Sequence, residues 1–196
     1  MRPDGIASVA FVAAFLCGAT AAAQHHDAPA PEPRYTRTTA VYSPPDVPLR
    51  SGGGTPTHLA AVLGAGGSMF LQFIFTSCPA VCPVMSASFA GVQSRLGSGD
   101  ARLRFVSISI DPAYDTPDRL RDYAKRFHAG AQWQFFTGNA EDIAAVQKAF
   151  ATYPGNNKMR HVPVTFFRAG PGLPWVRLEG LLNAGQLLGE YRGTMN

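Results

Sequence analysis

The amino-acid sequence predicts an α/β domain in which helices flank a central mixed β-sheet. Apolar runs with the length of buried strands recur along the chain, and segments with apolar residues at three- and four-residue spacing separate them. Strands that alternate with helices pair in parallel, whereas hairpins near both ends of the domain add antiparallel strands. With 196 residues, of which 46% are hydrophobic, the chain can bury one sizeable core.

The first elements lead up to the strongest strand of the sequence. Residues 47–49 and the glycine turn at 52–54 predict a short hairpin. Thr57 is then a candidate N-cap for a short helix. The run of apolar and aromatic residues at 69–75 predicts a buried strand, which passes into a helix at 83–96.

The remaining elements continue the alternation. Further strands are predicted at residues 103–110, 133–136, 162–167 and 175–178. Further helices are predicted at residues 117–127, 140–150 and 183–191, the first two with Thr116 and Asn139 as N-caps. The last two strands follow each other as a hairpin. This order fits a thioredoxin-like fold with an N-terminal hairpin extension.

The first 23 residues have the pattern of a cleaved signal peptide. Arg2 precedes an apolar stretch at 6–16, and Ala21 and Ala23 form a small-x-small cleavage site. This stretch of 11 residues is shorter than the roughly 20 apolar residues that a membrane span needs, which favours a cleaved signal peptide. We therefore expect export to the bacterial periplasm, with an uncleaved N-terminal anchor as the alternative. Residues 24–41 then form a linker rich in Pro and Ala, and residues 42–196 form the domain.

Cleavage after residue 23 would create an N-terminal Cu(II) site. Gln24 would carry the free amine and His26 would be the third residue. An amine, two backbone amides and an imidazole can form the square plane that Cu(II) favours. The alternative is that the histidines of the linker bind nothing.

The cysteines give the strongest indication of chemistry. Loss of the signal peptide removes Cys17 and leaves Cys78 and Cys82, both at the junction of the central strand and its helix. A disulfide between them would close a very small loop and would add little stability. At a helix N-terminus their thiolates are favoured, and two soft sulfurs suit either Cu(I) or a reversible disulfide. The pair therefore indicates metal binding or redox chemistry.

Two other residues are expected at the same edge of the sheet. His161 directly precedes a predicted strand, and in a thioredoxin-like fold the loop that enters this strand lies beside the cysteine loop. It is therefore the candidate third metal ligand. Asp111 ends the neighbouring strand and is a candidate for supporting the site or docking a partner. The alternatives are that Asp111 is a turn residue and that Asp115 supports the following helix cap.

Two motifs resemble those of a known family. Residues 75–83, Phe-Thr-Ser-Cys-Pro-Ala-Val-Cys-Pro, resemble the C-x-x-x-C-P motif of the SCO/SenC family of copper-binding, thioredoxin-like proteins. Residues 111–117 resemble its D-P-x-x-D-T-P segment, and His161 falls at the position of its ligand histidine. The similarity covers roughly residues 42–191.

This resemblance implies a copper metallochaperone. It implies that Cys78, Cys82 and His161 bind one copper ion, as Cu(I) or Cu(II), and that the protein helps to assemble the copper centre of cytochrome c oxidase. The implied partner is the copper-bearing subunit of the oxidase or another periplasmic copper chaperone. The protein would then be near the membrane through its partner rather than through a span of its own.

Other functions fit the sequence less well. A thiol–disulfide oxidoreductase would use one of Cys78 and Cys82 to attack a partner disulfide and the other to resolve the intermediate. Three residues separate the pair, whereas thioredoxin-type reductases have two. A peroxiredoxin-like peroxidase is disfavoured because Phe75 stands where that family has Thr. The net charge of +4, without a dense basic run, does not favour nucleic-acid binding.

Overall fold

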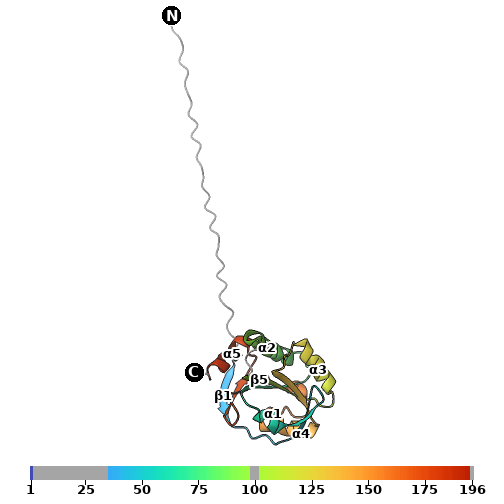
Figure 1. Cartoon of the computed structure of the whole chain (residues 1–196). Helices are drawn as coiled ribbons and strands as arrows, with labels where there is room; N and C mark the ends of the chain where they lie inside the picture. Colours follow the sequence, from blue (N-terminus) through green and yellow to red (C-terminus); the bar gives the residue numbers. More distant parts are fainter. Residues whose placement is uncertain (2–34, 98–101, 195–196) are drawn as a thin grey trace. The chain divides into compact units, whose positions relative to one another are not determined.

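The computed structural model describes Met1, residues 35–97 and residues 102–194 (Figure 1). The predicted signal peptide beyond Met1, most of the linker and the predicted Cu(II) site at Gln24 and His26 lie outside these residues. Within the described part of the chain, no helix has the length and hydropathy to cross a membrane.

The described strands form one mixed sheet in the order β1-β8-β7-β4-β5-β6-β2-β3. Their bounds are β1 (Thr36–Ala40), β2 (Pro48–Ser51), β3 (Pro56–His58), β4 (Ser68–Ile74), β5 (Leu103–Ser109), β6 (Trp133–Thr137), β7 (Val164–Arg168) and β8 (Trp175–Glu179). The central strands β4, β5 and β6 pair in parallel, whereas β7, β8, β1, β2 and β3 join by antiparallel pairing. This is the mixed sheet that the sequence predicts.

The helices cover both faces of the sheet (Figure 1). Their bounds are α1 (Leu59–Gly64), α2 (Val81–Leu96), α3 (Pro117–Arg126), α4 (Ala140–Ala149), α5 (Ala184–Arg192) and the short 3-10 helix η1 (Lys158–Arg160). Helices α2, α3 and α5 pack on one face, and α1 and α4 pack on the other. The α/β, thioredoxin-like fold is therefore confirmed.

The helix starts follow the predicted caps in two cases and differ in one. The Thr116 side chain accepts from the Arg119 amide, and the Asn139 side chain accepts from the Asp142 amide. Thr57, in contrast, does not cap α1, which begins at Leu59 after His58. Thr57 instead pairs with Leu49 in the β2–β3 hairpin, so strand pairing outweighs the local capping signal.

Strand β1 begins before the predicted start of the domain. Thr36–Ala40 falls within the stretch that the sequence assigns to a linker, but it pairs with all five residues of β8. This strand is mostly exposed and polar, because it lies at the edge of the sheet. Its sequence therefore lacks the apolar alternation by which strands are recognised.

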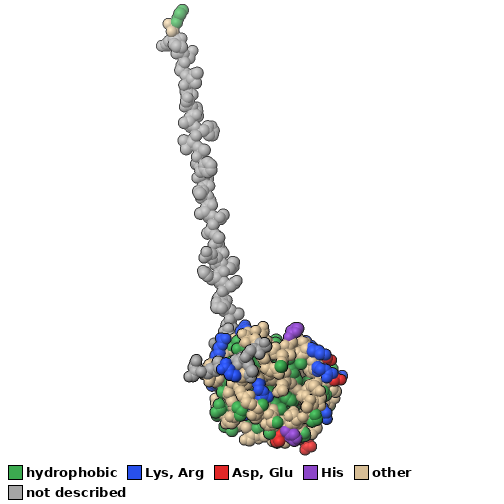
Figure 2. Space-filling model, in the orientation of Figure 1, with side chains coloured by type: hydrophobic (Ala, Val, Ile, Leu, Met, Phe, Trp, Pro, Cys, Tyr) green, Lys and Arg blue, Asp and Glu red, His purple; other side chains and the backbone are tan. Residues whose placement is uncertain are grey.

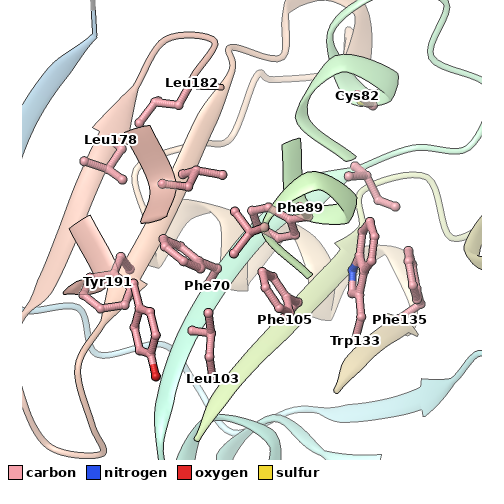
Figure 3. Packing of buried hydrophobic residues seen from close by; sticks show 14 of the residues in the cluster. Phe70, Cys82, Phe89, Leu103, Phe105, Trp133, Phe135, Leu178, Leu182 and Tyr191 are labelled. Carbon is pink, nitrogen blue, oxygen red and sulfur yellow. The ribbon is translucent and has the colours of Figure 1, made fainter. Parts of the chain in front are cut away.

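An aromatic cluster fixes helix α2 on the sheet (Figure 3). The Phe89 ring of α2 lies 5.2 Å from Phe105 and 5.6 Å from Trp133, measured between ring centroids. Cys82, at the start of the same helix, belongs to this buried cluster. The second core, on the opposite face, contains Trp175. The aromatic cluster thus holds the cysteine-bearing end of α2 in place.

On the face shown in Figure 2, Lys and Arg side chains lie in separate groups among polar and apolar side chains.

Candidate functional site

The two cysteines lie together where β4 ends and α2 begins. A turn leads from Phe75 to Cys78, whose amide donates to the Phe75 carbonyl at 3.1 Å. Cys82 lies in the first turn of α2, and its amide donates to the sulfur of Cys78 at 3.4 Å. Both cysteines are free, with exposed fractions of 8% for Cys78 and 0% for Cys82.

The two thiols differ in acidity. Burial alone would raise the pKa of Cys78. Its sulfur also accepts hydrogen bonds from the amides of Cys82, Ala80 and Val81 and from the Cys82 thiol. Together these bonds outweigh the effect of burial, so the pKa of Cys78 falls below the ordinary value. Burial raises the pKa of the Cys82 thiol well above its ordinary value, and the neighbouring Cys78 and Asp115 add to this shift. Cys78 is therefore the thiolate-forming residue, while Cys82 stays protonated until it is engaged.

This difference predicts the order in which the thiols react. In the reduced protein at neutral pH, iodoacetamide is expected to alkylate Cys78 at least about tenfold faster than Cys82. The reason is that each unit of difference in pKa changes the thiolate fraction up to tenfold. Mass spectrometry of the cysteine peptides over time measures both rates. In urea-unfolded protein the two rates are expected to converge. Faster alkylation of Cys82 in the folded protein would contradict this assignment.

Asp115 fastens the turn that precedes Cys78. Its buried carboxylate accepts from the Thr76 amide at 3.0 Å, from the Thr76 hydroxyl at 2.5 Å and from the Ser109 hydroxyl at 2.6 Å. These contacts differ from the alternative in which Asp115 supports the helix cap. The side chain that caps α3 is that of the neighbouring Thr116. Asp115 lies in the loop that leaves the carboxyl end of β5, where functional residues of α/β sheets collect.

His161 follows η1 and lies against the end of β4. Its side chain is 6% exposed, and its Nε2 atom lies 3.0 Å from the carbonyl oxygen of Phe73. Because a carbonyl only accepts, Nε2 carries the proton of the neutral ring. Burial lowers the pKa of His161, which keeps the ring neutral. The Nδ1 atom is buried and has no hydrogen-bond partner among the described residues, so its lone pair is free for another use.

The three predicted ligands are not gathered into one coordination sphere. Among residues 35–97 and 102–194, no group of three or more His, Cys, Asp or Glu side chains lies close enough to hold a metal ion. The two cysteines contact each other just after β4, whereas His161 contacts the Phe73 carbonyl near the end of β4. The chemistry of these donors, two thiols and an unpartnered imidazole nitrogen, nevertheless suits a soft metal ion.

Asp111 contacts the turn that carries His161 rather than the cysteines. Its carboxylate forms an ion pair with Lys158, the first residue of η1. Its amide donates to the Ser109 hydroxyl oxygen at 3.0 Å. The sequence does not predict Lys158 as a site residue. It lies 47 positions from Asp111 in the chain, and no local pattern indicates that the two pair.

A model of the SCO1/SenC family matches residues 58–166, which is more than half of the chain. The Bacillus subtilis SCO1 protein homolog is 30% identical over 132 residues. This match covers 64% of the chain and 62% of the relative, so the chain spans less than two thirds of the length of that relative.

Solved structures share the fold. A SCO1/SenC family lipoprotein from Bacillus anthracis has a TM-score of 0.69 at 22% identity, over 81% of this chain and 98% of that one. Bradyrhizobium japonicum ScoI, solved with copper bound, has a TM-score of 0.62 at 22% identity, over 76% of this chain and 98% of that one.

A third structure is that of BsSco, described as a member of the Sco family of cytochrome c oxidase assembly proteins with a disulfide switch. It has a TM-score of 0.63 at 22% identity, over 77% of this chain and 92% of that one. At these identities the structures establish the fold, and the family model covers both cysteines and the histidine. The chain therefore belongs to the SCO1/SenC family.

Proposed function

We propose that this protein is a copper metallochaperone that binds one copper ion through Cys78, Cys82 and His161 and passes it to a copper centre of cytochrome c oxidase. The observation that carries the proposal is the contact between two free thiols at the start of α2, next to the end of β4, where the Phe73 carbonyl holds His161 through Nε2 and leaves Nδ1 without a partner among the described residues. Copper is the cargo of this activity.

The protonation states of the three side chains suit copper capture. Cys78 forms a thiolate readily, because amide hydrogen bonds lower its pKa. His161 is neutral and offers Nδ1. Cys82 releases its proton when it binds the ion, which couples copper affinity to pH. For all three side chains to bind one ion, either the turn that carries Cys78 or the turn that carries His161 must shift locally.

The relatives support copper as the ion and the oxidase as the destination. ScoI from Bradyrhizobium japonicum was solved with copper bound, and BsSco is described as belonging to a family of cytochrome c oxidase assembly proteins. On this basis the partner is the copper-bearing subunit of the oxidase or another copper chaperone. Signal-peptide cleavage near residue 23 would place the protein in the periplasm, where it would meet such a partner.

Copper titration of a histidine variant tests the ligand set. The His161→Ala variant is expected to bind Cu(I) and Cu(II) about 100-fold more weakly than the reduced wild-type protein, since one ligand of a metal site contributes about 3 kcal/mol. Competition with a chromophoric copper chelator measures the affinity. The matched control is His58→Ala, because the His58 side chain is 63% exposed and pairs with Asp46 at 3.4 Å.

Thiol–disulfide exchange is the second candidate, and the unequal acidity of the cysteines favours it. The Cys78 thiolate would attack a partner disulfide and release one partner thiolate. Cys82 would then lose its proton and attack the Cys78 sulfur, which releases the second partner thiolate and leaves a Cys78–Cys82 disulfide. A thiol reductant in the compartment must restore the pair.

An insulin reduction assay separates the two functions. The chaperone proposal predicts slow turnover of insulin disulfides by the wild-type protein and a clear loss of copper affinity in His161→Ala. If the variant kept wild-type copper affinity while the protein reduced insulin quickly, the exchange function would replace the chaperone function.

A further inference from the structure

We infer that Asp111 and Lys158 form a latch that holds His161 with its Nδ1 atom presented for copper. This inference rests on the proposed copper-binding function and extends it to two positioning residues and one ligand atom. It begins from a chain of contacts that joins the histidine turn to the loop between β5 and α3.

The Asp111 end of the latch is rigid. Its amide is hydrogen-bonded to the Ser109 side chain, and its carbonyl accepts from the amides of Tyr114 and Asp115 at 2.9 and 2.8 Å. The Asp111 side chain is only 14% exposed in its ion pair with Lys158. The ammonium group of Lys158 also lies 5.4 Å from the centroid of the Phe75 ring, in the turn before Cys78. A partly buried pair of this kind fixes position better than an exposed one.

The Lys158 end of the latch transmits this position to His161. The His161 amide donates to the Lys158 carbonyl at 3.1 Å, which closes the single turn of η1. Asn157 caps the turn, because its side chain accepts from the Met159 amide at 3.0 Å. On the far side, the Gly180 amide donates to the Pro163 carbonyl at 2.9 Å. The backbone of His161 is thus held from both directions.

The ring of His161 has the hydrogen bonding that is typical of a metal-binding histidine. Histidines that bind metals donate their other ring N–H to a carbonyl, a carboxylate or water, and this bond fixes the tautomer and the ring orientation. His161 has such a bond from Nε2 to the Phe73 carbonyl, and no residue in the described part of the chain pairs with its buried Nδ1 atom. The geometry therefore identifies Nδ1 as the ligand atom and the Phe73 carbonyl as its orienting partner.

The same loop also holds the cysteine side of the site. The Ser109 hydroxyl accepts from the Asp111 amide and donates to the Asp115 carboxylate, and Asp115 in turn holds Thr76. The two carboxylates of the D-P-x-x-D segment therefore have separate tasks. Asp115 fastens the cysteine turn, and Asp111 fastens the histidine turn through Lys158.

The test compares Lys158→Met and Asp111→Asn with wild type and with His161→Ala. Each latch variant is expected to lose about 10- to 100-fold in copper affinity, as is usual when an outer partner of a ligand is removed. The Lys158→Met/His161→Ala double variant is expected to lose no more than His161→Ala alone, because the latch acts through the histidine. Lys125→Met is the matched control, since Lys125 pairs at 3.1 Å with Asp122 on the exposed side of α3, outside η1. Circular dichroism verifies that each variant is folded.

A second measurement on the copper-free protein separates the latch from the proposed function. In ¹⁵N-histidine NMR spectra, wild type and Lys125→Met are expected to show the His161 Nε2–H signal with Nδ1 unprotonated. Lys158→Met is expected to lose or shift that signal.

The outcomes are distinct. If His161→Ala weakens copper binding but Lys158→Met retains wild-type affinity and an unchanged NMR signal, the latch is refuted and the copper site stands. If Lys158→Met binds copper more tightly, the ion pair withholds the histidine and the inference is reversed. If His161→Ala has no effect on copper binding, the proposed ligand set fails, and the positioning role fails with it.

Discussion

The Asp115→Ala variant is expected to unfold with a free energy about 3–5 kcal/mol lower than that of the wild-type protein. The carboxylate of Asp115 is fully buried and accepts from the Thr76 amide, the Thr76 hydroxyl and the Ser109 hydroxyl. Each hydrogen bond to a charged group contributes about 1.5–3 kcal/mol, and relief from burying the charge offsets part of their sum. Urea unfolding of the reduced protein, followed by circular dichroism, measures the loss.

A nearby aspartate provides the control for this variant. Asp118 lies in the first turn of α3, its side chain is 78% exposed, and it pairs with Arg121 on the surface. Asp118→Ala is therefore expected to change the free energy of unfolding by less than about 1 kcal/mol. Asp115→Asn keeps the side-chain size but presents a donor where the carboxylate accepts, so an intermediate loss is expected. A loss below 1 kcal/mol for Asp115→Ala would show that the cysteine turn does not depend on this carboxylate.

Cys82→Ala is expected to reduce Cu(I) affinity by about 100-fold or more with only a small change in stability. A four-ligand structural metal site binds with an apparent free energy of about 10–16 kcal/mol, so one thiolate contributes about 3 kcal/mol, or roughly 100-fold. The buried thiol is also a small apolar group, and its removal leaves a cavity of only one atom. Chelator competition and urea unfolding on the same sample measure the two effects.

The companion variant Cys78→Ala makes the prediction sharper. Both single variants are expected to lose copper affinity, but Cys78→Ala also removes the thiol with the lowered pKa and so abolishes rapid alkylation. Oxidised wild-type protein, in which the pair is bridged, is expected to bind copper as poorly as the Cys78→Ala/Cys82→Ala double variant. Retention of stoichiometric, tight Cu(I) binding by that double variant would exclude the thiol pair as the copper site.

The sequence predicts the features that depend on local pattern. The strand-to-helix junction at Cys78, the hairpins and the caps at Thr116 and Asn139 all arise from residues close together in the chain. Edge strand β1 was missed because exposed, polar strands are stabilised by pairing with a neighbour and carry little apolar periodicity of their own.

The parts of the site that the sequence does not predict depend on long-range contacts. Asp115 reaches a residue 39 positions away, and Lys158 reaches one 47 positions away. No spacing rule connects such residues, and only the folded sheet brings them to one edge. The orientation of the His161 ring is likewise set by the Phe73 carbonyl, 88 positions distant. Fold and ligand candidates follow from pattern, whereas the scaffolding of the ligands follows from tertiary structure.

The division of the core by the sheet gives the protein two independent optical reporters. Trp133 and Trp175 are the two tryptophans of the chain, and they lie in the cores on opposite faces. The Trp133 indole donates to the Ser107 hydroxyl at 2.9 Å, whereas the Arg168 guanidinium lies 4.4 Å from the centroid of the Trp175 ring. Their emission spectra should therefore differ, and light from Trp133 reports on the face that carries the thiols while light from Trp175 reports on the other.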